Sequence, residues 1–159
     1  MKKAGLFIAV IVALALMAPV AASAGEKVNW VPADQAAKLA KKTGKKQYIF
    51  FYTDWCGYCK KMTGLTLADD AVARFLNENF VAVMINPEKD KDARTDIKAR
   101  GYPTNAFVDS SDKLITAIPG YSPPEYFLSL LKFIHTGANE SMSFKDFLAQ
   151  QQEKDKAGQ

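Results

Sequence analysis

The sequence is short of the residues that bind metals and haem. It holds two cysteines, Cys56 and Cys59, and a single histidine, His135, which is distant from them in sequence. A structural zinc site needs about four protein ligands, so this set argues against zinc. Covalent c-type haem attachment needs a histidine directly after the second cysteine, and Lys60 stands there. No cofactor and no metal are therefore expected.

The chain also lacks a large excess of either sign of charge. The chain has 21 Lys and Arg against 17 Asp and Glu, a formal net charge of +4. Without residues 1–24, which include Lys2 and Lys3 and no acidic residue, the net charge falls to +2. We find no clustered Lys/Arg stripe, so nucleic acid is not expected as a partner. The chain also lacks internal repeats and low-complexity tracts, and its length and composition predict one globular domain.

Residues 1–24 have the pattern of a secretory signal peptide. A basic start is followed by the apolar stretch 6–17, and Ala22-Ser23-Ala24 is a typical cleavage site, so cleavage is predicted after Ala24. The alternative is an uncleaved anchor, because residues 4–24 are uncharged and long enough to cross a bilayer. The two-lysine start favours bacterial export, and we expect the mature protein in the periplasm, an oxidising compartment.

The rest of the chain predicts an α/β fold. A helix is expected over 32–42, a buried strand over 47–52, a helix from Asp69-Asp70, and a second buried strand over 80–86. This order is strand, helix, strand. A right-handed crossover makes the two strands parallel.

The second half predicts a hairpin and further helices. We expect a short helix over 92–100, strands over 105–109 and 114–118 joined by a turn, and a helix that begins at Pro123-Pro124. An amphipathic helix over 144–148 would precede a polar tail, 150–159, that frays. The expected organisation is a domain over 25–140 and a C-terminal segment over 141–159. The domain would hold a central mixed sheet of about four strands, flanked by helices.

The spacing of Cys56 and Cys59 favours redox chemistry. A purely structural disulfide would close too short a loop to stabilise the fold much. If Cys56 caps a helix that begins at Gly57, unpaired backbone N–H groups and the helix dipole stabilise its thiolate, which lowers its pKa. Cys59 follows one turn later and lies deeper, where it can attack a mixed disulfide formed at Cys56. We therefore expect a solvent-facing Cys56 as the nucleophile and Cys59 as the resolving thiol.

Two motifs resemble the thioredoxin superfamily. The first is the stretch FFYTDWCGYCKK around the cysteine pair, and the second is the stretch 97–104, which ends in Tyr102-Pro103-Thr104. The resemblance covers about residues 30–135 and implies a three-layer thioredoxin-like fold. It also implies a cis-proline at Pro103, beside the cysteine pair. The residues expected at the substrate-binding surface are Trp55, Gly57, Tyr58, Tyr102, Pro103 and Thr104. Trp55 and Tyr58 would form an apolar docking patch there, although packing beside the buried strand is an equal alternative for Trp55.

The resemblance has departures. Phe50 stands where the family usually has a buried aspartate that moves a proton for the second cysteine. Asp54 is close in sequence, but a solvated loop residue is the favoured interpretation of it over a catalytic one. The CGYC tetrapeptide looks like that of periplasmic disulfide isomerases, while the remainder is more similar to small exported thioredoxins and to the C-terminal domain of the transmembrane thiol reductant transporter. The isomerases carry a separate dimerisation domain, for which this sequence has no room, so we expect a monomer.

These observations predict a periplasmic thiol-disulfide oxidoreductase that exchanges disulfides with cysteine-containing exported proteins, acting as a reductase. A reductase must be recharged, and a membrane-bound thiol electron donor is the expected source. A disulfide oxidase or isomerase remains an alternative, as does a module that handles Cu(I) through its two thiolates. A thioredoxin-like scaffold without redox activity is the third.

Overall fold

The computed structural model describes residues 25, 27–91 and 93–157. The predicted signal peptide lies outside the described residues. The strands are β1 (Lys46–Phe51), β2 (Phe80–Ile85), β3 (Thr104–Val108) and β4 (Leu114–Pro119). The α-helices are α1 (Ala33–Thr43), α2 (Gly57–Lys61), α3 (Asp70–Asn79), α4 (Pro124–His135) and α5 (Phe144–Ala157). A π-helical turn, Met62–Thr66, extends α2, and a 3-10 turn, Ala138–Glu140, follows α4.

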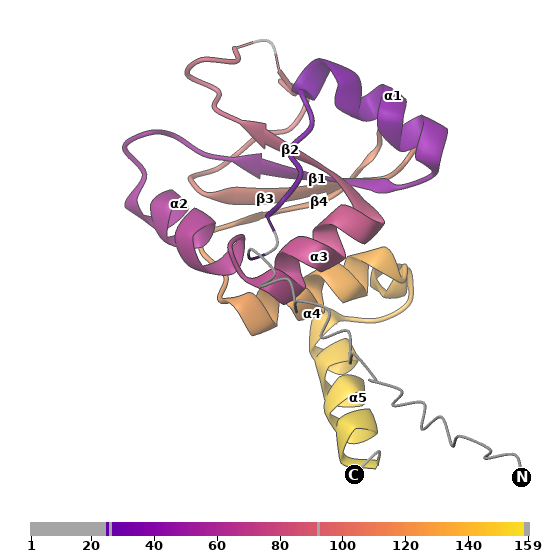
Figure 1. Cartoon of the computed structure of the whole chain (residues 1–159). Helices are drawn as coiled ribbons and strands as arrows, with labels where there is room; N and C mark the ends of the chain where they lie inside the picture. The colour runs from indigo at the N-terminus through magenta and orange to yellow at the C-terminus, as the bar shows by residue number, and fades with distance from the viewer. Residues whose placement is uncertain (1–24, 26, 92, 158–159) are drawn as a thin grey trace, which may run out of the picture.

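The strands form one mixed sheet in the order β2-β1-β3-β4 (Figure 1). β1 pairs in parallel with β2, as the predicted crossover through α3 requires. β1 pairs antiparallel with β3, and β3 and β4 form the predicted antiparallel hairpin. The predicted four-stranded mixed sheet is confirmed. Its central strand β1 ends at Phe51, five residues before the first cysteine.

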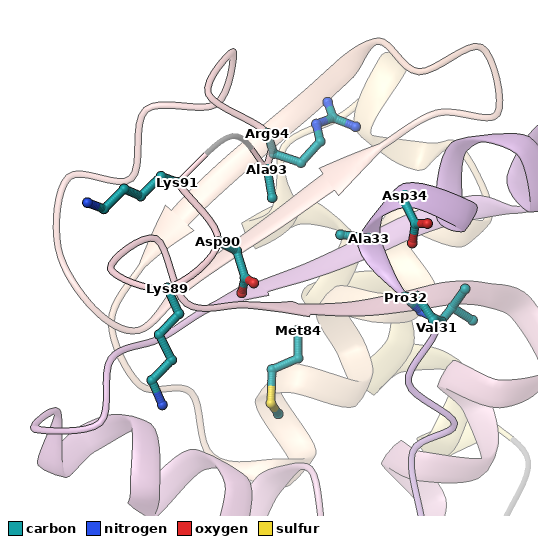
Figure 2. Close-up of a pocket in the computed structure, with 10 residues that line it drawn as sticks. All are labelled: Val31, Pro32, Ala33, Asp34, Met84, Lys89, Asp90, Lys91, Ala93 and Arg94. Atoms are coloured by element: carbon teal, nitrogen blue, oxygen red, sulfur yellow. The ribbon is translucent and has the colours of Figure 1, made fainter.

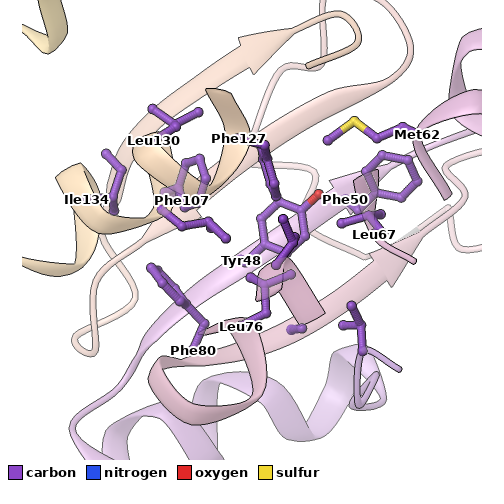
Figure 3. Packing of buried hydrophobic residues seen from close by; sticks show 14 of the residues in the cluster. Tyr48, Phe50, Met62, Leu67, Leu76, Phe80, Phe107, Phe127, Leu130 and Ile134 are labelled. Carbon is purple, nitrogen blue, oxygen red and sulfur yellow. The ribbon is translucent and has the colours of Figure 1, made fainter. Parts of the chain in front are cut away.

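The sheet has a hydrophobic core on each face because β1 is buried on both sides. Alternate side chains of β1 point to opposite faces, so Tyr48 and Phe50 enter one cluster while Ile49 and Phe51 enter the other. Helix α1 covers the second face, and α3 and α4 lie on the first (Figure 1). Figure 3 shows the first cluster, in which Tyr48 packs among rings and aliphatic side chains from several elements. This confirms the predicted sandwich of helices around a sheet.

A chain of hydrogen bonds crosses the core that contains Tyr48. The hydroxyl of Tyr48 donates a hydrogen bond to Asn105 Oδ1 at 2.8 Å, and Asn105 Nδ2 donates to the backbone oxygen of Gly120 at 3.1 Å. Burial raises the pKa of Tyr48 well above its usual value, because the charged phenolate would lose its hydration there. The chain links β1, β3 and the residue just past β4.

The helix predicted over 92–100 is wrong. The described residues 93–100 form turns and irregular backbone. Arg94 has a positive φ of 55°, and its guanidinium binds two carboxylates, with Nη2 2.8 Å from Asp96 and Nη1 2.5 Å from Asp112. A left-handed residue interrupts an α-helix, and these ion pairs hold Arg94 in that conformation.

The polar C-terminal tail is helical rather than frayed as far as Ala157. Helix α5 begins beside α4, where Phe144 and Phe147 pack against Phe133, and Phe144 meets Tyr126 edge to face. Once these rings fix the first turns, propagation is inexpensive, because Gln, Glu, Lys and Ala are good helix formers. Across the described ranges, no helix has both the length and the apolarity needed to cross a membrane.

Candidate active site

Both cysteines lie at the start of α2, and they form a disulfide with each other. Cys56 is the N-cap residue of α2, with extended backbone, and Gly57 is the first helical residue. The Sγ atom of Cys56 accepts a hydrogen bond from the backbone N–H of Cys59 at 3.0 Å. The predicted capping role of Cys56 is thus confirmed. A sulfur in this position faces backbone N–H groups that stabilise negative charge on it.

The two sulfurs differ little in accessibility. Cys56 is 5% exposed and Cys59 is 2% exposed, so Cys56 is the outer of the two, as expected, but the disulfide form covers it more than a solvent-facing thiol implies. The surface at Gly57 is open, since a Cβ placed there would meet no atom within 4 Å apart from its chain neighbours and the backbone of α2. A partner can therefore approach the pair from the Gly57 side.

Aromatic side chains flank this approach. Trp55 is 68% exposed and Tyr58 is 65% exposed, which is unusual for rings of this size. The Trp55 ring meets that of Tyr102 edge to face, with the centroids 6.1 Å apart. This contact brings the cysteine loop next to the second sequence motif. The peptide bond between Tyr102 and Pro103 is cis, as the resemblance implied.

The loop around Pro103 is fixed by hydrogen bonds within the protein. Pro103 and Thr104 are buried, and the hydroxyl of Thr104 donates to the backbone oxygen of Gly101 at 2.6 Å. The backbone oxygen of Pro103 accepts from the N–H of Gly120 at 2.7 Å. Gly120 has a φ of +100°, a conformation that residues with a side chain rarely adopt. The Thr104 side chain is thus engaged inside the protein, whereas Trp55, Tyr58 and Tyr102 have surface to offer a partner.

A polar brace that the sequence analysis missed links the cysteine loop to the loop after β2. Trp55 Nε1 donates to Glu88 Oε1 at 2.9 Å, and Lys89 Nζ lies 2.7 Å from Asp54 Oδ2. Asn86 Nδ2 donates weakly to Asp54 Oδ1 at 3.4 Å. The hydrogen bond and charge of Asp54 raise the pKa of Lys89. The predicted topology did contain a signal for this contact. Because β1 and β2 are parallel neighbours, the loops that follow them begin at the same edge of the sheet.

Phe50 stands where the family usually has a buried aspartate, and no described acidic side chain takes that buried place beside Cys59. Phe50 is fully buried, and its ring stacks on that of Tyr52 with centroids 6.1 Å apart. A pocket of about 230 Å³ lies beside Cys59. Its lining residues are Tyr52, Thr53, Asp54, Cys59, Lys60, Thr63 and Met84. Asp54 is an exposed loop residue, as favoured from the sequence. It is also the acidic residue among those that line this pocket.

A second pocket lies on the other side of Met84, between the start of α1 and the loop after β2 (Figure 2). Its volume is about 740 Å³, and both acidic and basic residues line it. Neither cysteine is among them. Within the described ranges no group of three or more His, Cys, Asp or Glu side chains is arranged to hold a metal ion. The redox pair at α2 is therefore the chemically distinctive site in the described part of the chain.

Several known proteins are similar to this chain in sequence or in fold. A protein disulfide-isomerase of Hordeum vulgare is 32% identical over 107 residues, which cover 67% of this chain and 20% of that protein. The thiol:disulfide interchange protein DsbD of Actinobacillus pleuropneumoniae is 31% identical over 104 residues, 62% of this chain and 18% of that protein. The solution structure of a thioredoxin from Thermus thermophilus superposes with a TM-score of 0.60 at 25% identity, covering 68% of this chain and 87% of that one.

The chain spans about a fifth of the length of the curated relatives that it matches. The similarity is therefore to one domain of larger proteins. A family model described as a thioredoxin-like domain matches residues 33–135, from the start of α1 to the end of α4. This range holds the whole sheet, the cysteine pair and Pro103. The chain belongs to the thioredoxin-like domain family.

Proposed function

We propose that the protein is a thiol-disulfide oxidoreductase that exchanges disulfides with protein substrates through Cys56. The observation behind this proposal is the Cys56–Cys59 disulfide at the first turn of α2, beside the exposed rings of Trp55 and Tyr58. In the reduced protein, the Cys56 thiolate attacks a substrate disulfide, and one substrate thiolate leaves. Cys59 then attacks Cys56 Sγ, so the mixed disulfide breaks and the second substrate thiol is released. Two electrons pass to the substrate.

The proposed direction is reduction of the substrate. A strongly oxidising pair requires a reduced form that is unusually well stabilised. In the disulfide form, Cys56 Sγ accepts a hydrogen bond from one neutral backbone N–H, and no charged side chain of the described residues donates a hydrogen bond to either sulfur. Modest stabilisation of the thiolate favours a low potential, which is the property of a reductant. An oxidase or isomerase is the alternative that a potential measurement addresses.

The proposed setting is the bacterial periplasm. The basic start, apolar stretch and Ala22-Ser23-Ala24 site support export with cleavage after Ala24. The substrates would be cysteine-containing exported proteins. A membrane-bound dithiol would return the protein to its reduced form. The protein would act as a monomer. Fractionation of cells and N-terminal sequencing test this part. A mature chain that begins at Gly25 in the periplasmic fraction supports it, and full-length chain in the cytoplasm or membrane contradicts it.

Insulin reduction tests the activity. The wild-type protein should accelerate reduction of insulin by dithiothreitol, and Cys56→Ser should abolish the acceleration, because the one thiol left, Cys59, is buried deeper than Cys56. Without dithiothreitol, reduced Cys59→Ser should form a mixed disulfide with the substrate and stop there. Tight copper binding by a protein that shows no exchange would support the Cu(I) module instead. Circular dichroism of each variant verifies that the fold is retained.

Equilibration with glutathione buffers tests the direction. A reduction potential near about −270 mV fits a reductase, whereas one near about −120 mV fits an oxidase. The fraction of disulfide is read by alkylating free thiols and measuring mass. A value at the oxidising end would overturn the proposed direction while leaving the exchange chemistry intact.

A further inference from the structure

The outer side of β4 is an open edge of the sheet, because no other described strand pairs with it. Natural proteins usually protect such edges with charged residues or cover them, since an open edge pairs readily with another chain. The six residues of β4 include no charged side chain, and all of them are half-exposed or exposed. The other three strands are almost wholly buried. This edge is therefore suited to accept a further strand.

The hydrogen bonds to β3 show which backbone groups of β4 point outward. In an antiparallel ladder, residues that bond to the partner strand alternate with residues whose N–H and C=O point away from it. The N–H of Gly120 donates to the backbone oxygen of Pro103 at 2.7 Å, so Gly120 is a bonded position. Counting back from it, Ile118 also bonds to β3, whereas Ala117 and Pro119 point outward. Since proline has no N–H, Ala117 is the residue that offers both a donor and an acceptor.

A groove lies beside β4 on each face of the sheet, where the alternate side chains of an added strand would go. On the face that α4 covers, the groove has a volume of about 360 Å³ and is mostly apolar. Its lining includes Ile118 of β4, Tyr126 of α4 and Phe144 of α5. Tyr126 is 47% exposed, so its ring has surface left for a partner. Apolar side chains of an added strand fit this face.

On the opposite face, a groove of about 500 Å³ lies between β4 and the segment 96–100. Ala117 lines it together with two basic residues, Lys98 and Arg100. Both basic residues are exposed, and neither forms an ion pair with another described residue. The acidic residue of the lining, Asp96, is already bound by Arg94, through Nε at 3.0 Å and Nη2 at 2.8 Å. The unpaired charge on this face is therefore positive, and acidic side chains complement it.

The same charges disfavour a second copy of the protein as the occupant of this edge. Two β4 strands paired antiparallel would be related by a twofold axis perpendicular to the sheet, so the same face of both copies would lie on one side. Lys98 and Arg100 of the two copies would then approach one another, and like charges repel. An acidic segment of another protein is favoured instead.

We propose that the outer edge of β4 binds an extended segment of a partner protein in which acidic and apolar side chains alternate. The backbone of the segment pairs with the N–H and C=O of Ala117. Directly opposed residues of paired strands share a face, so the side chain opposite Ala117 lies on the basic face and is acidic. Its two neighbours enter the apolar groove beside α4. No cysteine takes part, so the segment binds in either redox state.

This position places the partner near the cysteine pair. Strand pairing puts Phe51, Thr104 and Pro119 in one row across the sheet. Phe51 ends β1, which leads to the cysteines, so β4 ends at the same edge of the sheet at which α2 begins. A partner bound along β4 is held at the end of the sheet that carries Cys56, which raises its effective concentration there. Only this consequence rests on the proposed exchange activity.

Fluorescence anisotropy with labelled peptides tests the binding. The probe is Thr-Leu-Glu-Val-Glu-Leu-Thr, in which acidic and apolar residues alternate. One control peptide, Thr-Leu-Lys-Val-Lys-Leu-Thr, reverses the charge, and another, Thr-Leu-Val-Glu-Glu-Leu-Thr, keeps the composition without the alternation. The probe should bind, and each control should bind about tenfold more weakly, because two ion pairs or the fit to both faces is lost. Added salt should weaken binding of the probe.

Charge reversal in the protein locates the acidic side chains of the probe. Lys98→Glu combined with Arg100→Glu should weaken binding of the probe about tenfold, and this variant should prefer the lysine peptide. Lys38→Glu combined with Lys42→Glu, at exposed positions of α1, changes the net charge equally and should bind the probe like wild type.

Amide hydrogen exchange followed by NMR tests the strand pairing. The N–H of Ala117 should exchange quickly in the free protein and about tenfold more slowly with saturating probe, whereas that of Ile118 should be slow in both. Ala117→Pro should abolish binding, because it removes the outward N–H at a position where an edge strand tolerates proline, as at Pro119. Ala117→Ser keeps the N–H and should bind the probe. Circular dichroism verifies that each variant is folded.

Each result decides for or against the site. Equal binding of the three peptides, or wild-type binding of the probe by the Lys98→Glu and Arg100→Glu variant, would overturn it. Slow exchange at Ala117 without peptide, with sedimentation as a dimer, would overturn it too, because a second copy would then occupy the edge. The peptides contain no cysteine, so binding of the probe supports the site even if insulin reduction fails. Active protein that does not bind the probe would overturn the site alone.

Discussion

At the scale of single residues, Trp55 is the most exposed large ring beside the disulfide, and two unlike contacts fix its orientation. Glu88 accepts a hydrogen bond from its indole nitrogen, and Tyr102 meets its ring edge. A ring that is already oriented loses little side-chain entropy when a substrate packs on it. Trp55 is therefore suited to bind an extended segment without itself taking part in sulfur chemistry.

Replacing Trp55 by alanine should weaken substrate binding more than turnover. Loss of one aromatic packing surface corresponds to about 1 kcal/mol, or roughly a fivefold rise in KM, with kcat little changed. Steady-state kinetics of insulin reduction measure both constants. Leu39→Ala, an exposed apolar residue on α1, is the control and should leave both unchanged. An equal loss in kcat would instead place Trp55 in the chemical step.

Replacing Tyr48 by phenylalanine should destabilise the protein by about 1–2 kcal/mol, because Asn105 Oδ1 then stays buried without its donor. The pH dependence identifies the cause. The folded-state pKa of Tyr48 is raised, so its contribution is complete below the unfolded-state pKa and is lost as the pH rises beyond that value. Urea unfolding at increasing alkaline pH should show a steeper loss for wild type than for Tyr48→Phe. Parallel losses in the two proteins would contradict this assignment.

At the scale of elements, α5 depends on its first two turns. Phe147 is buried against Phe133, while the later part of the helix is polar and mostly exposed. The C-terminal segment is thus a helix packed on α4 at one end.

Removing the ring of Phe147 tests how much the packing of α5 on α4 stabilises the fold. Phe147→Ala should lower the free energy of unfolding by about 3 kcal/mol, the lower range for loss of a buried phenylalanine. Gln152→Ala, at an exposed position of the same helix, should change it by no more than about 0.5 kcal/mol. Urea denaturation gives both values. A small effect of Phe147→Ala would show that α5 is dispensable for the core.

Some elements of this fold could be predicted from the sequence and others could not. Buried strands and amphipathic helices were predictable because their periodicity is local, and so were the cap at Cys56 and the hairpin. The loop after β2 was not, because it depends on pairs distant in sequence, such as Arg94 with Asp112 and Asp54 with Lys89. Likewise, nothing in the local sequence of Thr53 indicates that its hydroxyl is buried without a partner.

At the scale of the whole molecule, the redox state and the folding equilibrium are linked. A pair with a low potential has an oxidised form that is more stable than the reduced form, whereas a strong oxidant has the opposite order. We expect the oxidised protein to unfold at a higher urea concentration than the reduced protein. Parallel urea titrations with and without dithiothreitol measure the difference. A more stable reduced form would contradict the proposed reductase.

The chain has no cysteine beyond the single pair. One molecule therefore stores at most two electrons and has no second pair to which it could pass them internally. In the proposed cycle, the protein must leave its client after each turnover before it can be recharged, and the proposed thiol donor has to reach the same sulfur past Trp55 and Tyr58. Client and donor consequently compete for one surface, so a high concentration of either should inhibit the cycle.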